Sequence, residues 1–221
     1  MNTRRLQVTD DGSHTLTSDK IGENYHSKFG AIQESKHIFI DAGITAVANN
    51  KNKQINVLEV GTGTGLNILL TYLWSEKYNI SIKYYGYEPY PISKNDVILL
   101  NYPKQLGVDE ELFFHIHDEI GKPVNLSDKF SLLVNKSTIQ SVKLKPGYYD
   151  VIYFDAFSPD SQPEMWTTEV FGKIYDSLVS GGVLTTYSCK GNVKRSLIEA
   201  GFSIEKLPGP PGKREFLRAW K

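Results

Sequence analysis

The chain has 221 residues, of which 40% are hydrophobic and 23% are charged, a composition typical of one globular domain with a sizeable core. Its 25 basic residues balance its 25 acidic residues, which excludes a global field that would attract nucleic acid or anionic membranes. A single cysteine, no apolar run of about 20 residues and no signal-peptide pattern predict a cytoplasmic protein with no internal disulfide and no membrane span.

The first 50 residues predict a hairpin and a helix. Two alternating segments within residues 5–17 flank Asp11-Gly12, a pair that favours a tight β-turn. A loop over 22–30 follows, and apolar residues at helical spacing predict a helix over 31–49. We therefore expect residues 1–50 to form a small extension that packs on a domain of residues 51–221.

From residue 55 onward, strand and helix patterns alternate. Strands are predicted over 55–60, 81–87, 149–155 and 182–188, and helices over 65–78, 92–102, 164–179 and 192–200. Two short strands are expected over 112–117 and 130–134, and a final hairpin over 202–207 and 214–220. This alternation predicts an α/β fold with a doubly wound, mostly parallel sheet and helices on its faces.

A glycine-rich turn joins the first strand of this series to its helix. Gly61, Gly63 and Gly65 follow Glu59, and glycines allow a tight turn and a close approach of a ligand to the backbone. A dinucleotide site would need glycine where Leu66 stands, and Glu59 would repel a pyrophosphate. A carboxylate at this point suits the ammonium end of S-adenosylmethionine, directly or through water.

Two further carboxylates stand at the ends of predicted strands. Glu88 follows strand 81–87, where a carboxylate can accept both ribose hydroxyls of a nucleoside cofactor. Asp155 ends strand 149–155, and ligands in such folds bind beyond the carboxyl ends of the strands. A carboxylate there can accept an amine N–H and stabilise the cation that forms on methylation, although Asp155 could also merely cap a helix. Phe157 could stack on a planar substrate or serve as a core anchor.

The carboxyl-terminal part of the chain is basic. Residues 189–221 hold eight basic residues against three acidic ones. This segment is either a solvated basic face or a surface that contacts phosphates. A pair of histidines, His115 and His117, would share one face of the predicted strand 112–117, but no third ligand accompanies them, so no metal site is predicted.

Several short motifs occur in a fixed order and give a resemblance to a known family. They are Asp11-Gly-Ser-His-Thr-Leu, Glu23-Asn-Tyr-His, Gly30-Ala-Ile-Gln-Glu, Gly63-Thr-Gly-Leu-Asn, Asp155-Ala-Phe-Ser-Pro, Pro163-Glu-Met-Trp and Lys213-Arg-Glu. Together they resemble the methyltransferase module of the bifunctional tRNA 5-methylaminomethyl-2-thiouridine biosynthesis protein, MnmC, over nearly the whole chain. The resemblance implies a class I S-adenosylmethionine-dependent methyltransferase fold, whose sheet carries a terminal antiparallel hairpin. It also implies methylation of 5-aminomethyl-2-thiouridine at the tRNA wobble position, with S-adenosylhomocysteine as the other product.

The resemblance also implies roles for particular residues. The cofactor positions fall on Glu59, Gly61, Gly63, Gly65, Asn67 and Glu88. The substrate side falls on Tyr25, His26, Gln33, Glu34, Asp155, Phe157 and Pro159, with Lys213 and Arg214 as candidate phosphate contacts. Asp155, Phe157 and His26 are the catalytic candidates, although His26 could equally be a hydrogen-bonded loop residue. The family's acid near the adenine has no clear counterpart in residues 130–136, where Asn135 is the candidate substitute.

The bifunctional family members carry an FAD-dependent oxidoreductase domain, and 221 residues leave no room for one. We therefore expect the amine to be supplied by a separate FAD-dependent oxidoreductase or another upstream tRNA-modifying enzyme. Two alternatives stay open: transfer of a methyl or aminopropyl group to a free small amine, and a non-catalytic module that keeps the fold. The oligomeric state does not follow from the sequence.

Overall fold

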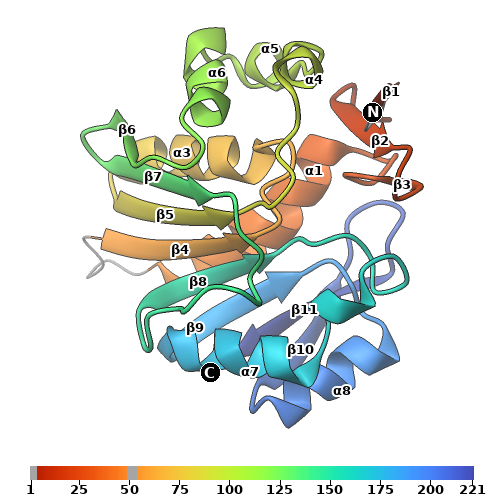
Figure 1. Cartoon of the computed structure of the whole chain (residues 1–221), viewed down its shortest axis with the longest axis vertical. Coiled ribbons are helices and arrows are strands. Elements are labelled where there is room, and N and C mark those ends of the chain that lie inside the picture. Colours follow the sequence, from red (N-terminus) through yellow and green to blue (C-terminus); the bar gives the residue numbers. More distant parts are fainter. Residues whose placement is uncertain (1–3, 49–53) are drawn as a thin grey trace.

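An eight-stranded sheet forms the centre of the computed structural model, which describes residues 4–48 and 54–221 (Figure 1). The strands are β4 Gln54–Val60, β5 Ser81–Tyr87, β6 Val124–Ser127, β7 Phe130–Asn135, β8 Tyr149–Phe154, β9 Leu178–Thr186, β10 Ser203–Pro208 and β11 Glu215–Trp220. Their spatial order is β10-β11-β9-β8-β4-β5-β7-β6. The central strands β9, β8, β4, β5 and β7 are parallel, whereas β11, β10 and β6 pair antiparallel. The predicted mostly parallel sheet with a terminal hairpin is confirmed.

The parallel strands bring distant chain segments to one edge of the sheet. Val60 pairs with Tyr87 on one side and with Phe154 on the other, so β4, β5 and β8 end at the same level. The residues that follow these strands therefore meet at the carboxyl edge, where ligands bind in open α/β sheets.

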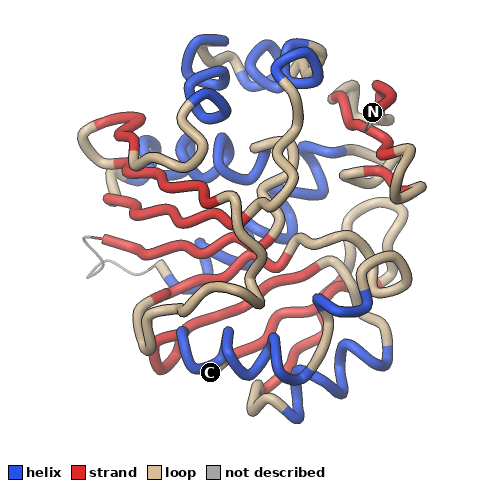
Figure 2. The backbone as a smooth tube through the Cα atoms, in the orientation of Figure 1, coloured by secondary structure: helices blue, strands red, loops and turns tan. Residues whose placement is uncertain are grey.

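Helices cover both faces of the sheet (Figure 2). One face carries α1 Ala31–Ser35, the π-helix η1 Lys36–Ile44, α2 Thr45–Val47 and α3 Leu66–Tyr78, with α4 Lys94–Ile98, α5 Tyr102–Leu106 and α6 Glu110–Asp118. The other face carries α7 Thr168–Ser177 and α8 Gly191–Glu199, with the short 3-10 helix η2 Pro163–Met165. Alternate strand residues fill the two cores, because successive side chains point to opposite faces: Val57 and Leu58 lie in different cores.

The predicted helix over 31–49 is present as α1, η1 and α2, and its last residue lies outside the described ranges. A glycine lets this segment approach the sheet closely. A Cβ on Gly43 would stand 3.1 Å from the Tyr153 ring and 3.3 Å from Thr185 Oγ1. A larger residue at this position would therefore push the helix away from β8 and β9.

The predicted amino-terminal hairpin is also confirmed. It consists of β1 Arg4–Val8 and β2 His14–Ser18, and β3 Glu23–Asn24 extends it to three strands. The backbone N–H of His14 donates to Asn101 Oδ1 at 2.8 Å, which ties this small sheet to the main domain. The expected boundary between residues 50 and 51 lies outside the described residues.

The predicted strand over 112–117 is wrong, because this segment is helix α6. Asp109 caps it by accepting the N–H of Glu111 at 2.9 Å, and Phe113 and Ile116 are buried one helical turn apart. Leu112, Phe114 and Ile116 alternate as in a strand, but the packing of Phe113 and Ile116 against the first core favours the helix. The two histidines consequently do not share a face: His115 is exposed, whereas His117 is largely buried.

Other boundaries differ from the predictions for local reasons. The predicted helix 92–102 is divided into α4 and α5, since Pro103 stands in the first turn of α5 and favours a new helix start. The predicted helix 164–179 is η2 followed by α7, and β9 begins at Leu178 rather than at residue 182. Strand β6 was not predicted. Within 4–48 and 54–221, no helix is long and apolar enough to span a bilayer.

Candidate active site

A cavity of about 930 Å³ lies at the carboxyl edge of β4, β5 and β8, next to the amino-terminal sheet. This volume is in the usual range of small-molecule sites. Ten of the predicted site residues line it: Tyr25, His26, Glu34, Gly61, Gly63, Asn67, Glu88, Asp155, Phe157 and Lys213. Six others do not: Gln33, Glu59, Gly65, Asn135, Pro159 and Arg214.

The glycine turn after β4 is packed so tightly that side chains do not fit. Gly61 has φ +86°, and a Cβ there would stand 2.6 Å from the carbonyl oxygen of Asp155. Gly63 has φ +46°, and its Cβ would stand 2.9 Å from the Tyr25 ring. Both positions therefore need glycine for conformation and for space, and the turn presents bare backbone to the cavity.

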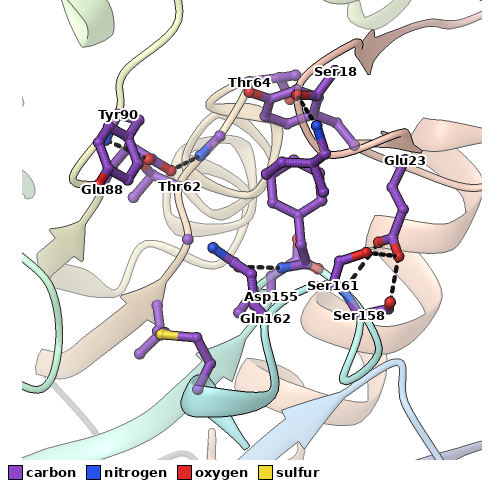
Figure 3. A pocket seen from close by; sticks show the side chains of 18 of the residues that line it. Ser18, Glu23, Thr62, Thr64, Glu88, Tyr90, Asp155, Ser158, Ser161 and Gln162 are labelled. Atoms are coloured by element: carbon purple, nitrogen blue, oxygen red, sulfur yellow. Dashed lines mark hydrogen bonds between the residues drawn. The ribbon is translucent and has the colours of Figure 1, made fainter.

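Glu88 is held by two backbone N–H groups (Figure 3). Its Oε2 accepts from Gly63 at 3.0 Å and its Oε1 accepts from Tyr90 at 2.9 Å. Burial raises the pKa of Glu88, while these two N–H groups and the charge of Arg4 act in the opposite direction. Each carboxylate oxygen keeps further lone pairs for a donor in the cavity, which is the arrangement that a pair of ribose hydroxyls requires.

Asn67, in the first turn of α3, links two buried carboxyl groups. Its Nδ2 donates to Glu59 Oε1 at 2.8 Å and to Asp155 Oδ2 at 3.0 Å, and Glu59 also accepts from the Tyr84 hydroxyl at 2.8 Å. Glu59 has no exposed surface and does not line the cavity, and burial raises its pKa to about 8. Glu59 was expected to meet the cofactor directly or through water, and in this geometry Asn67 stands between its carboxyl group and the cavity.

The amide oxygen of Asn67 is free to accept. Asn67 Oδ1 is buried and has no hydrogen-bond partner among the described residues. A buried acceptor without a partner is costly, so a donor in the cavity would satisfy it. The ammonium end of an amino acid is such a donor, and the residues present thus fit S-adenosylmethionine.

Asp155 directly follows the end of β8 and lines the cavity. Burial, followed by the negative charge of Glu34, raises its pKa to about 8, whereas the Asn67 hydrogen bond and Lys213 act in the opposite direction. A carboxyl group that titrates near neutrality can take up and release a proton under ordinary conditions.

The loop that follows Asp155 is fixed by the amino-terminal sheet. Glu23 of β3 accepts the backbone N–H of Ser158 at 3.1 Å, the hydroxyl of Ser158 and the hydroxyl of Ser161 (Figure 3). Inside the loop, Phe157 meets the Tyr25 ring edge-on at 5.0 Å between centroids. Sequence analysis gave Glu23 no role, and its motif offered no signal for a contact 135 residues away in the chain.

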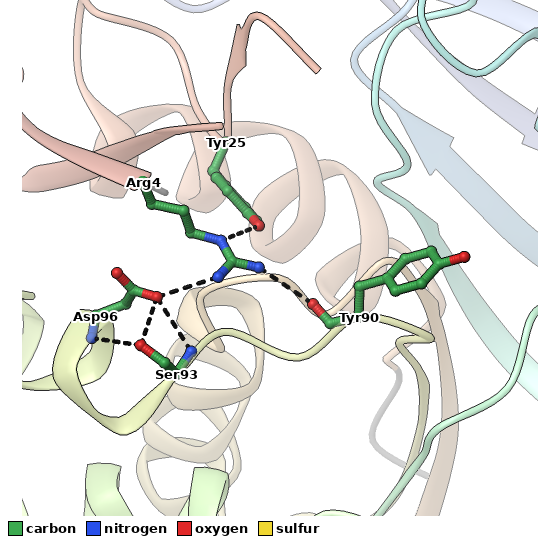
Figure 4. Close-up of polar contacts among 5 residues, drawn as sticks. All are labelled: Arg4, Tyr25, Tyr90, Ser93 and Asp96. Carbon is green, nitrogen blue, oxygen red and sulfur yellow. Dashed lines mark hydrogen bonds and ion pairs between the residues drawn. The ribbon is translucent and has the colours of Figure 1, made fainter. Parts of the chain in front are cut away.

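Arg4 also joins the amino-terminal sheet to the segment that follows Glu88 (Figure 4). Its Nε donates to the Tyr25 hydroxyl at 2.9 Å, its Nη1 pairs with Asp96 at 3.1 Å and its Nη2 donates to the Tyr90 carbonyl at 3.4 Å. Arg4 lines the cavity, although no motif predicted it.

His26 lines the cavity but has both ring nitrogens engaged. Nδ1 lies 3.1 Å from Thr15 Oγ1, Nε2 lies 3.4 Å from Thr64 Oγ1, and burial lowers its pKa to about 4. His117 lies under the same turn, with Nε2 3.2 Å from the Thr64 carbonyl and 2.9 Å from where a Cβ on Gly65 would stand. Gly65 thus makes room for α6 rather than for a ligand.

The remaining predicted residues lie around the cavity. Asn135 ends β7, and its carbonyl accepts the Glu88 N–H at 2.9 Å, so it supports the loop that carries Glu88. Gln33 and Arg214 are exposed, and Pro159 is buried outside the lining. Residues 138–140 line the cavity beyond β7 and were not predicted. In the described parts of the chain, no group of three or more potential metal ligands was found.

The fold and this site define a class I S-adenosylmethionine-dependent methyltransferase. Residues 124–221 match a family model described as an S-adenosyl-L-methionine-dependent methyltransferase. Two spermidine synthase structures, one of them from Thermotoga maritima, also superpose, with a TM-score of 0.60 and 14% identity, which shows the fold alone.

Within this class the chain is similar to proteins named MnmC. It is 30% identical to the tRNA 5-methylaminomethyl-2-thiouridine biosynthesis bifunctional protein MnmC of Aromatoleum aromaticum, over 97% of this chain and 35% of that protein. It is 29% identical to MnmC of Legionella pneumophila strain Corby, over 99% of this chain and 36% of that protein. A crystal structure of MNMC2 from Aquifex aeolicus superposes with a TM-score of 0.81 and 26% identity, over 100% of this chain and 70% of that one. The chain spans about a third of the length of the bifunctional relatives.

Proposed function

We propose that the protein transfers a methyl group from S-adenosylmethionine to the amine of 5-aminomethyl-2-thiouridine at the wobble position of tRNA. The observation that carries this proposal is the half-buried carboxyl of Asp155, which lines the same cavity as Glu88 at the carboxyl edge of the sheet. The similarity to proteins named for tRNA 5-methylaminomethyl-2-thiouridine biosynthesis supports the choice of acceptor.

On the cofactor side, three features of the chain would hold the donor. Glu88 would accept the ribose hydroxyls, Asn67 Oδ1 would accept from the ammonium end, and the bare backbone at Gly63 would allow close approach. When bound, S-adenosylmethionine supplies a sulfonium methyl group that an amine nitrogen with a free lone pair can take. Residues 138–140, which line the cavity beyond β7, would contact the nucleobase of the donor.

On the acceptor side, Asp155 would accept an N–H of the amine and direct its lone pair. Phe157 and Tyr25, which meet edge to face, provide an aromatic wall for a planar base. Orientation of the nitrogen and stabilisation of the developing cation are the two contributions that this geometry offers to catalysis.

We further propose tRNA as the partner and the cytoplasm as the location. The relatives are bifunctional proteins, and the chain spans about a third of them. We also propose that an FAD-dependent oxidoreductase or another upstream tRNA-modifying activity supplies the amine.

The test is a transfer assay with methyl-labelled donor and two acceptors, undermodified bulk tRNA and a polyamine mixture. The proposal expects label in tRNA and none in the polyamines. Label in the polyamines alone would support the small-amine alternative, and donor binding without transfer to either acceptor would support a non-catalytic module.

A further inference from the structure

Lys213, which the sequence suggested as a phosphate contact, lies inside the cavity. Its Nζ is 3.2 Å from Glu34 Oε1 and 4.5 Å from the centroid of the Tyr187 ring. Its side chain is 27% exposed and that of Glu34 is 8% exposed, so this pair is largely withdrawn from water. The turn that carries Lys213 is fixed to η1, because His37 Nε2 lies 2.8 Å from the Pro208 carbonyl.

Glu34 is fixed as well. Its second oxygen, Oε2, accepts the backbone N–H of Ser27 at 2.7 Å. Glu34, Lys213 and Asp155 all line the cavity, yet they come from α1, the β10–β11 turn and the end of β8. The fold therefore brings two carboxyl groups and one ammonium group together around the acceptor side.

The charges that act on Asp155 come from several elements. The ionisable groups that interact with it are Glu34 on α1, Glu59 on β4, Tyr84 on β5, Tyr187 after β9 and Lys213 on the β10–β11 turn. Lys213 is the cation of this set, as far as the described residues show. Glu34 favours the protonated form of Asp155, and Lys213 favours the ionised form.

We propose that Lys213 is a positioning residue for the transfer: by pairing with Glu34, it keeps Asp155 able to take a proton from the incoming alkylammonium group. This inference rests on the proposed function. In the step concerned, an N–H bond of the ammonium group breaks and an O–H bond forms on Asp155. The ammonium and carboxylate become a neutral amine and a carboxylic acid, and the electron pair of the broken bond stays on nitrogen as the lone pair.

The first test measures Asp155 directly and needs no activity. The carboxyl carbons of aspartate are titrated by ¹³C NMR, and the signal of Asp155 is identified by its absence in Asp155→Asn. Lys213→Met should raise the titration midpoint by about one pH unit, because Glu34 is then unopposed. Lys213→Arg should leave it near the wild-type position, and Glu34→Gln should lower it, which tests the inference even if Lys213→Met does not fold.

The second test uses the rate of transfer to tRNA as a function of pH. In Lys213→Met the rising limb of kcat should move to higher pH by the same amount, so that kcat near neutrality falls about tenfold, with an unchanged KM for tRNA. The double variant with Glu34→Gln should restore the limb. Lys36→Met is the matched control, since Lys36 lies two residues after Glu34, is exposed and does not line the cavity.

The inference would be overturned if the titration midpoint of Asp155 moved neither in Lys213→Met nor in Glu34→Gln. So would a raised KM for tRNA with a flatter salt dependence and no change in the pH profile, because Lys213 would then be a phosphate ligand. If the wild-type protein methylates no tRNA while the midpoints move as expected, the proposed function fails but the control of Asp155 by Lys213 stands.

Discussion

The carboxyl group of Asp155 is half-buried and accepts a hydrogen bond from a neutral donor, the amide of Asn67. Asn67 Nδ2 donates to one of its oxygens at 3.0 Å, and the other oxygen is available for the acceptor amine. Because the same Asn67 also binds Glu59, the amide is held from two sides and fixes the direction of the Asp155 carboxyl. In the proposed function Glu88, the glycine turn and Asn67 Oδ1 hold the donor, so removing the charge of Asp155 should leave most donor contacts in place.

Asp155→Asn keeps the shape and one acceptor oxygen but removes the negative charge. We expect turnover to fall about 100-fold or more, as for the loss of a single electrostatic stabiliser, with little change in donor affinity. Single-turnover kinetics and calorimetric titration of the donor measure the two effects. A parallel loss of donor binding would show that Asp155 is a cofactor ligand, and near-normal turnover would show that its charge has no part in catalysis.

At the scale of elements, the turn between β4 and α3 determines whether the donor can approach. Gly63→Val should reduce donor affinity by at least tenfold, because the added side chain meets Tyr25 and fills the approach to the backbone. Gly147→Val is the matched control: Gly147 has a similar φ of +55°, and a Cβ there has no atom within 4 Å. Calorimetry should show wild-type donor affinity for the control, and equal losses in both variants would mean that backbone strain alone is responsible.

Helix α6 supports the same turn through His117. Burial lowers the pKa of His117 from 6.5 to about 4, so the folded protein holds it neutral. Its contribution to stability is present above pH 6.5 and is lost as the pH falls toward 4, since the unfolded chain takes up the proton first. His117→Phe cannot lose stability in this way. The difference in the free energy of unfolding between the wild-type protein and the variant should therefore shrink by about 3 kcal/mol as the pH falls from 6.5 to 4.

Urea unfolding at several pH values from about 4 to 7 measures this difference. The control is His115→Phe on the same helix, whose side chain is exposed, so its effect should depend little on pH. A constant difference between the wild-type protein and His117→Phe would contradict the buried, neutral state of His117.

The strand and helix patterns of the sequence predicted those site residues whose positions depend only on the order and direction of the strands. Glu88 and Asp155 could be placed from sequence because parallel strands end at one edge, and the glycine turn lies between the first strand and its helix. The inward direction of Glu59 could not be predicted, because it depends on Tyr84 and Asn67 from other elements.

The contacts of Arg4 and Glu23 cross between distant parts of the chain, and no pattern within the amino-terminal segment encodes their partners. The position of Lys213 likewise depends on how the β10–β11 turn packs against α1. For α6, the alternation of Leu112, Phe114 and Ile116 favours a strand, whereas the spacing of Phe113 and Ile116 favours a helix, and tertiary packing decides between them.

At the scale of the whole molecule, the basic carboxyl-terminal segment is partly neutralised. Lys190 pairs with Asp160, and Lys194 lies 4.0 Å from Glu215. Lys206 lies 3.7 Å from the same Glu215, and Lys213 lines the cavity, whereas Arg195 and Arg214 are exposed and form no ion pair with the described residues.

If Arg195 and Arg214 contact tRNA phosphates, reversing both charges should weaken tRNA binding at least tenfold at low salt. The slope of log K against log salt should fall by about 1 to 2, because one counterion is released for each phosphate contact. Fluorescence anisotropy at several salt concentrations measures both quantities, while donor affinity serves as the control. An unchanged slope would mean that these arginines form a solvated face.

Mass spectrometry of tRNA nucleosides tests the central claim most directly. Undermodified tRNA that carries 5-aminomethyl-2-thiouridine is incubated with the protein and S-adenosylmethionine, digested and compared with a parallel reaction of Asp155→Asn. We predict that the wild-type protein converts 5-aminomethyl-2-thiouridine to its N-methyl derivative and that the variant leaves it almost unchanged. Persistence of the unmethylated nucleoside with the wild-type protein, despite measured donor binding, would contradict the account.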